Sequence, residues 1–172
     1  MRKFVWLFIG IILAVVLVSA LPVAAQQTYS SGPVPAQIGT AKKAFISNAG
    51  GECAPFGKAV YSSGPDTAYD EFYSAMKSWG QLTLVGAPAD ADLVLQIHFT
   101  CPFYFAVDNG RVDAQFRVTF IDPKTGIVLW AVTEHSQTAR SKSKLDKEFD
   151  KSMVALVADV KGIVQLAGSS SK

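Results

Sequence analysis

The sequence predicts an α+β fold, a two-layer open sandwich in which a mixed, mostly antiparallel sheet of about five strands carries two helices on one face. Two observations lead to this fold class. Apolar and polar residues alternate through 93–107, and turn signals follow, as expected of antiparallel strands. Two further segments, 66–79 and 143–164, repeat apolar residues at three- and four-residue spacing, as amphipathic helices do.

The chain opens with the three-part layout of a secretory signal. Residues 1–3 are basic, residues 4–21 form an unbroken apolar run, and Pro22 to Ala25 supply a helix breaker followed by small residues. We therefore expect residues 1–25 to be a cleaved signal peptide that exports a bacterial protein to the periplasm or the medium, with no stable membrane span left. The alternative is an uncleaved inner-membrane anchor at residues 4–21, because this run approaches the shortest length that spans a bilayer.

The rest of the chain reads as one domain with short polar ends. Residues 26–40 are rich in Ser, Gly, Pro and Gln and are expected to form a flexible linker, residues 41–167 the α+β domain, and residues 168–172 a disordered tail. The whole chain carries 16 Lys and Arg against 14 Asp and Glu. Arg2 and Lys3 leave with the signal, so the mature chain balances at 14 against 14, which argues against a nucleic-acid partner.

The two cysteines, Cys53 and Cys101, are expected to form a disulfide, because their number is even and the chain is exported. The alternative is a zinc site completed by His98 and His135: His98-x-x-Cys101 has a plausible spacing for a ligand pair, but Cys53 and His135 lack matching local partners. A disulfide requires the ends of the first and third strands to meet. The first strand is then the parallel neighbour of the third.

The first half of the domain is expected to supply two strands and a helix. Residues 43–47 form a strand that residues 48–51 close with Asn and Gly. Asp66 is placed to cap a helix that runs to Trp79, and Gly80 is placed to end it. A second short strand follows at residues 82–85.

The first of two predicted hairpins turns at Asn109-Gly110, a pair typical of two-residue loops. This turn pairs apolar residues across the strands: Phe105 with Ala114, Phe103 with Phe116, Cys101 with Val118, and Phe99 with Phe120. Pro102 has no N–H to donate, so the ladder is expected to break there.

The second predicted hairpin turns at residues 122–126 and returns as residues 127–136. It also pairs apolar residues: Phe120 with Val128, Val118 with Trp130, and Phe116 with Val132. A long amphipathic helix from about Ser143 is expected to cover the apolar face of the sheet with the first helix.

The outer face of this sheet should be polar without being densely charged. We take it as a candidate recognition face, with an ordinary solvated surface as the alternative. Its members are Gln96, His98, Gln115, Arg117, Thr119 and Thr133.

No catalytic signature is present: the chain has no G-x-S-x-G, no C-x-x-C and no phosphate-binding glycine loop. Asp90 and Asp92 could join His98 and His135 as ligands of a metal-dependent hydrolase, although turn and strand-entry roles explain the two aspartates as well.

Four stretches resemble a group of poorly characterised bacterial exported proteins and lipoproteins. They are residues 42–46, 79–85, 89–95 and 121–130, which include a small-Asp-Leu-Val-Leu strand and an Asp-Pro-x-Thr-Gly hairpin. The layout also resembles the N-terminal domain of the Tol-Pal protein TolB and the periplasmic domain of the curli secretion channel. The resemblance implies an envelope accessory or assembly role without catalysis, and it supplies no binding residues. Unlike the lipoproteins, this chain has no cysteine near the end of its leader.

These observations predict an exported, non-enzymatic accessory domain that binds a protein or another envelope component and needs no cofactor or metal. The alternatives are the metal-dependent hydrolase and a purely structural envelope protein.

Overall fold

The computed structural model describes residues 32–53, 60–62, 64, 66–104, 111–139 and 141–169. The chain divides after Gly32, and the elements below all belong to the second unit, Pro33–Lys172. The predicted signal peptide and the end of the predicted tail lie outside the described residues.

The domain is built on one open five-stranded sheet with the strand order β2-β1-β3-β6-β7. The strands are β1 (Lys43–Glu52), β2 (Thr83–Leu84), β3 (Leu93–Thr100), β6 (Ala114–Ile121) and β7 (Val128–Ser136). β1 runs parallel to both of its neighbours, whereas β6 runs antiparallel to both β3 and β7. This mixed sheet confirms the predicted α+β fold class, including the parallel contact between the first and third strands.

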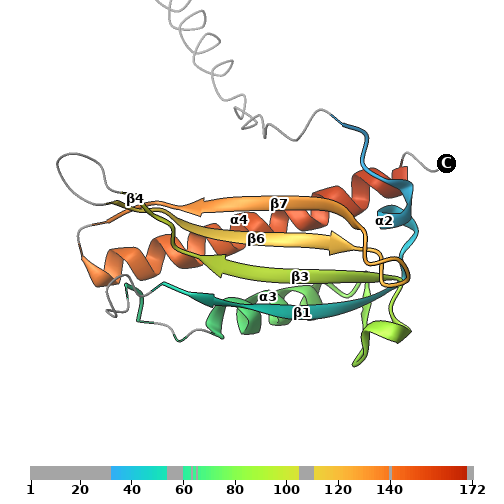
Figure 1. Ribbon diagram of the computed structural model, residues 1–172, viewed down its shortest axis with the longest axis horizontal. Coiled ribbons are helices and arrows are strands. Elements are labelled where there is room, and N and C mark those ends of the chain that lie inside the picture. Colours follow the sequence, from blue (N-terminus) through green and yellow to red (C-terminus); the bar gives the residue numbers. More distant parts are fainter. Residues whose placement is uncertain are drawn as a thin grey trace, which may run out of the picture. The chain divides into compact units, whose positions relative to one another are not determined.

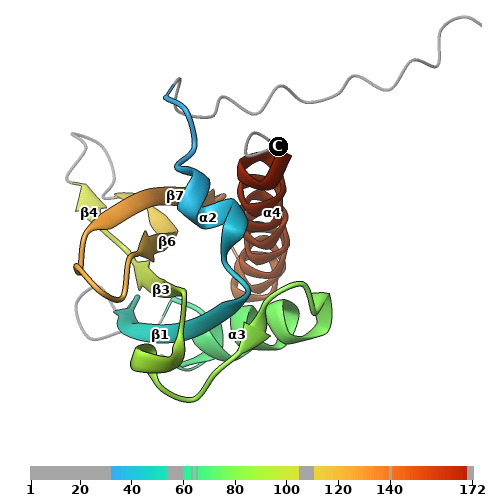
Figure 2. The ribbon, with the colours of Figure 1, turned by 90° about the vertical axis from the view of Figure 1, so that its right-hand side faces the viewer.

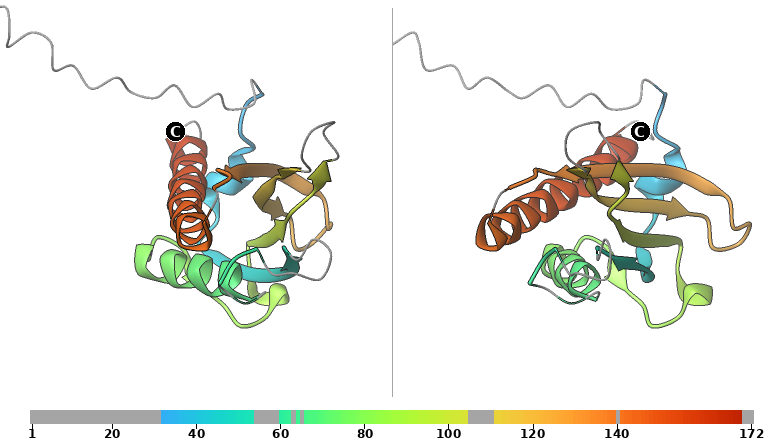
Figure 3. Two further views of the ribbon diagram at one scale, coloured as in Figure 1. Left: turned by 90° about the vertical axis from the view of Figure 1, so that its left-hand side faces the viewer. Right: turned by 60° about the vertical axis from the view of Figure 1, so that its left-hand side comes forward.

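Two long helices, α3 (Thr67–Trp79) and α4 (Lys142–Ser169), pack side by side on the same face of the sheet (Figures 1 and 2). Apolar side chains of both helices meet the alternate residues of β3 and β6 that point toward them. The largest fully buried side chains are Phe72, Phe116, Phe120, Ile38, Met76, Leu93, Leu95, Ile97, Leu156, Ile163, Val118 and Val160. The opposite face of the sheet is left without a helical layer among the described residues (Figure 3).

A third helix, α2 (Ala36–Thr40), corrects the expectation of a flexible linker through residue 40. Ile38 is completely buried, and Gly39 lies against the backbone of Ala167 and Gly168 near the end of α4. This stretch is mostly polar, but it contains one buried apolar residue, Ile38, and one glycine, Gly39, at which two backbone segments lie close together. The folded unit therefore begins before residue 41.

The first hairpin has a different register from the predicted one. The structure pairs Leu95 with Phe120 and Phe99 with Phe116, whereas the Asn109-Gly110 turn would have paired Phe99 with Phe120. The ladder breaks at Pro102 as expected, and it resumes with the same offset between β4 (Phe103–Tyr104) and β5 (Arg111–Val112).

The last residues that the structure pairs across β4 and β5 are Tyr104 and Arg111. The predicted turn itself lies outside the described residues. Since the register differs by an even number of residues, every side chain keeps its predicted face of the sheet.

The second hairpin is shifted as well, by two residues, whereas the first is shifted by four. Phe120 pairs with Trp130, Val118 with Val132, and Phe116 with Glu134 instead of Val132. At the turn end the register slips by one residue between Phe120 and Ile121, so that Ile121 pairs with Val128. The turn is closed by the two carboxylate oxygens of Asp122, which accept hydrogen bonds from the Lys124 amide (3.0 Å) and the Thr125 hydroxyl (2.7 Å).

Two local expectations in the first half of the domain are wrong. β1 continues to Glu52 instead of ending at residues 48–51, because Gly50 adopts a positive φ of 80° and the strand passes an irregularity there. Asp66 precedes α3 but makes no capping hydrogen bond; it accepts one from the Asn48 side chain (3.1 Å). Gly80 ends the helix as predicted, with a φ of 69°.

In the described part of the chain, α4 is the one helix long and apolar enough to cross a membrane by length and composition, and half of that stretch is buried inside the domain.

Candidate functional site

The six residues of the predicted recognition face come together on three neighbouring strands. Gln96 on β3 pairs with Thr119 on β6, and His98 pairs with Arg117, which in turn pairs with Thr133 on β7. Gln115 lies one row further along β6. We call this surface the polar face: Gln96, His98, Gln115, Arg117, Thr119 and Thr133.

The polar face owes its position to strand alternation. On β3 the odd-numbered residues Leu95, Ile97 and Phe99 are buried, so Gln96 and His98 point to the other side of the sheet. All six members are half-buried or exposed, and Arg117 is an exposed cation in the middle row. The arrangement offers amide, hydroxyl and imidazole groups around one fixed positive charge, which suits a polar or acidic partner surface.

A hydrogen-bonded cluster extends the polar face at one end. The sequence patterns did not predict this cluster. The ring nitrogen Nδ1 of His135 lies 2.9 Å from the carboxylate oxygen Oδ1 of Asp113, and the Gln115 amide donates to the other oxygen of that carboxylate. Burial acts to raise the pKa of Asp113, but the hydrogen bonds from His135 and Gln115 outweigh it and lower this pKa. His135 pairs with Gln115 across β6 and β7, so the cluster follows from the observed register.

The structure does not bring together the residues proposed as ligands of a metal-dependent hydrolase, Asp90, Asp92, His98 and His135. Asp92 accepts hydrogen bonds from the backbone amides of Lys42 and Lys43, each at 2.9 Å, and these bonds lower its pKa. His98 lies six residues further along β3, about 20 Å away at the rise of an extended strand. Among the described residues no three His, Cys, Asp or Glu side chains gather where they could hold a metal ion.

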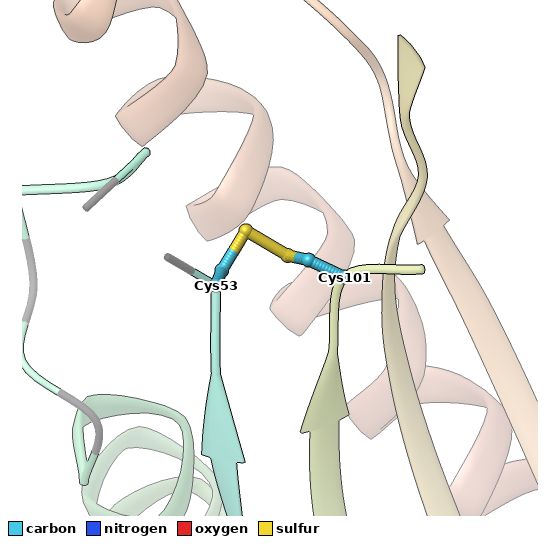
Figure 4. The surroundings of a disulfide bond; sticks show 2 residues. All are labelled: Cys53 and Cys101. Carbon is cyan, nitrogen blue, oxygen red and sulfur yellow. A yellow bond between two sulfur atoms is a disulfide. The ribbon is translucent and has the colours of Figure 1, made fainter. Parts of the chain in front are cut away.

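The cysteines do not offer zinc ligands, because Cys53 and Cys101 are joined in a disulfide with their Cα atoms 5.0 Å apart (Figure 4). The bond links the end of β1 to the end of β3, where the sequence pattern predicted that the two strands meet.

A pair of carboxyl groups between the sheet and the helices was not predicted from the sequence either. Glu134 on β7 stands opposite Phe116 and therefore faces the helix layer, where it meets Asp159 of α4, a residue only 6% exposed. Burial, a hydrogen bond with Asp159 and the charge of Asp159 raise the pKa of Glu134 to about 7, and nearby His135 opposes this shift. Near neutral pH Glu134 can therefore still hold a proton and donate it in the hydrogen bond with Asp159.

Comparison with protein-family models gives no match for this chain, and no curated protein matches it either. Solved structures do match. Protein XCC0632 from Xanthomonas campestris, a DUF330 protein, is 14% identical and overlaps 84% of this chain and 95% of its own with a TM-score of 0.50. At this identity the likeness shows a shared fold and nothing of function.

Two further structures overlap more loosely. PelC, solved as a dodecamer from Paraburkholderia phytofirmans, is 22% identical over 79% of this chain and 94% of its own, with a TM-score of 0.42. The uncharacterized lipoprotein B from Nitrosomonas europaea is 8% identical over 84% and 93%, with a TM-score of 0.44. The resemblance to the TolB and curli channel domains stays an expectation from the sequence.

Proposed function

We propose that this protein is an exported, non-enzymatic accessory domain of the bacterial envelope that binds a partner through the polar face. The observation that carries the proposal is the gathering of Gln96, His98, Gln115, Arg117, Thr119 and Thr133 in register on the sheet face opposite α3 and α4. The hydrogen-bonded strands hold these groups at fixed spacings, so a partner can match them without a large entropy cost.

Export is supported by the N-terminal pattern of residues 1–25 and by the disulfide, since disulfides persist in oxidising compartments. In this proposal residues 1–25 are removed, the mature domain is periplasmic or secreted, and no cofactor takes part. The partner is a protein or another envelope component whose contact surface is polar and carries acidic groups for Arg117.

Affinity capture from an envelope extract tests the proposal. We expect the wild-type protein to retain a specific partner and the double variant Arg117→Glu plus Gln115→Glu to lose it, because two carboxylates then replace the cation and the amide. Lys124→Glu, a charge reversal in the exposed β6–β7 turn, is the matched control and should capture as the wild type does. Equal capture by the double variant would contradict binding through this face.

A further inference from the structure

The helix layer carries a groove that the polar face does not use. It runs between α3 and α4, has a volume of about 680 Å³, and is open to solvent. Figures 2 and 3 show α3 next to α4, at an angle to it, on the same face of the sheet. The groove therefore belongs to the side of the domain opposite the polar face.

The middle of the groove is apolar. Met153 and Val157 of α4 form its floor and are 4% and 7% exposed. Val154 lines the groove on the same helix and leaves 70% of its surface to solvent, the largest exposed fraction among the large hydrophobic residues described. An exposed branched aliphatic side chain beside a recessed apolar floor is a feature of surfaces that dock a partner.

One end of the groove is acidic. Glu71 of α3 and Asp150 of α4 both line it and lie close enough for their charges to interact. Burial and the charge of Asp150 raise the pKa of Glu71, so a negative charge on Glu71 is disfavoured at this end of the groove. A positive charge entering here would relieve the repulsion between them.

The other end of the groove is basic. Lys161 of α4 lines it, and its ammonium nitrogen lies 5.8 Å from the ring centroid of Trp79 on α3. Because Glu71 meets Asp150 and Trp79 meets Lys161, the two helices run parallel along the groove. From residue 150 to residue 161, α4 rises about 16 Å, or three helical turns.

We propose that this groove binds an amphipathic helical segment of a partner protein, whose apolar side chains cover Val154 and whose basic side chain reaches Glu71 and Asp150. The choice rests on charge complementarity: the groove is negative at one end, positive at the other about three helical turns away, and apolar between them. A partner helix lying between α3 and α4 can also pack its ridges of side chains into the grooves of both helices, as neighbouring helices in soluble proteins do. A phospholipid would match the apolar floor and Lys161, but it leaves the acidic end without a counter-charge.

Site-specific photocrosslinking of the full-length protein in its native cells tests this proposal. A benzophenone amino acid replaces Val154, and a matched variant carries it at Val128, which is 55% exposed on β7 and distant from the groove. We expect an adduct from position 154 to a partner segment that combines apolar residues at helical spacing with Lys or Arg at one end, and no such adduct from position 128.

Charge variants give the second arm of the test. The double variant Glu71→Lys plus Asp150→Lys should reduce the yield of the adduct at least tenfold. The milder double variant Glu71→Gln plus Asp150→Asn should also reduce this yield. Thermal unfolding checks that the milder variant remains folded. Any of four results would overturn the proposal: an adduct to a second copy of this chain, an adduct to lipid, no adduct at all, or an adduct yield that neither pair of charge variants changes. Because Arg117→Glu leaves the groove intact, the adduct should survive in that variant even where binding to the polar face is lost.

Discussion

At the scale of single residues, the Glu134–Asp159 pair makes the contact between β7 and α4 sensitive to pH. The pKa of Glu134 is about 7 in the folded protein and 4.5 as an ordinary glutamate. The folded state therefore holds a proton that the unfolded state has released between these values, so its stability falls as the pH rises from 4.5 to 7. Above pH 7 this loss is complete.

Glu134→Gln should remove that loss, because an amide resembles the protonated carboxyl group and can still donate a hydrogen bond to Asp159. We expect the variant to be about 1–2 kcal/mol more stable than the wild type at about pH 8, a figure reduced for solvent screening, and about equally stable near pH 4.5. Urea unfolding at the two pH values measures the difference. Asp70→Asn, on the exposed side of α3, is the control for the loss of one negative charge. If Glu134→Gln and the wild type were equally stable at the higher pH, the raised pKa of Glu134 would be contradicted.

At the scale of elements, the contact between α2 and α4 depends on Gly39. A Cβ atom at this position would lie 2.1 Å from the backbone nitrogen of Gly168 and 2.2 Å from the backbone carbon of Ala167. Neither backbone atom can move aside without shifting the end of α4.

Gly39→Ala should therefore destabilise the domain by about 1–3 kcal/mol, although alanine favours helix formation. Gly86→Ala, where an added Cβ meets nothing within 4 Å, is the matched control. Thermal unfolding compares the two variants, and a Gly39→Ala protein as stable as the control would show that α2 does not dock as described.

The disulfide acts on the same scale, because it ties the ends of two parallel strands that are 48 residues apart in the sequence. Cys53→Ser plus Cys101→Ser should lower the free energy of unfolding by about 3–4 kcal/mol, chiefly by freeing the unfolded chain. Denaturant unfolding measures this change. A loss below about 1 kcal/mol would mean that the bond contributes little to this fold.

Alternation along the strands was enough to predict which residues face the helices, since Leu95, Ile97 and Phe99 lie on the expected side. It was not enough to predict the register. A shift by an even number of residues keeps every side chain on its face, and the irregularity at Phe120 leaves no periodic signal. The polar face was therefore predictable, whereas the Asp113–His135 cluster and the Glu134–Asp159 pair depend on the register and were missed.

At the scale of the whole molecule, the domain separates two surfaces. The polar face lies on one side of the sheet, and the helix layer with its apolar groove lies on the other. A two-layer sandwich leaves one face of its sheet uncovered, so the side chains on that face can serve recognition without weakening the core.

The proposal includes cleavage of the N-terminal segment, residues 1–25. We expect intact-mass measurement on protein purified from the envelope fraction to show the loss of residues 1–25 and, without reductant, a mass two hydrogens lower than that of the free dithiol. Retention of the leader would favour the inner-membrane anchor at residues 4–21.

The central claim is that the polar face makes the contact with the partner, and the dissociation constant of the captured partner for purified variants tests it most directly. We predict that Arg117→Glu plus Gln115→Glu raises this constant at least tenfold, while Lys124→Glu changes it less than twofold. Equal constants for the wild type and the double variant would place the contact elsewhere on the molecule.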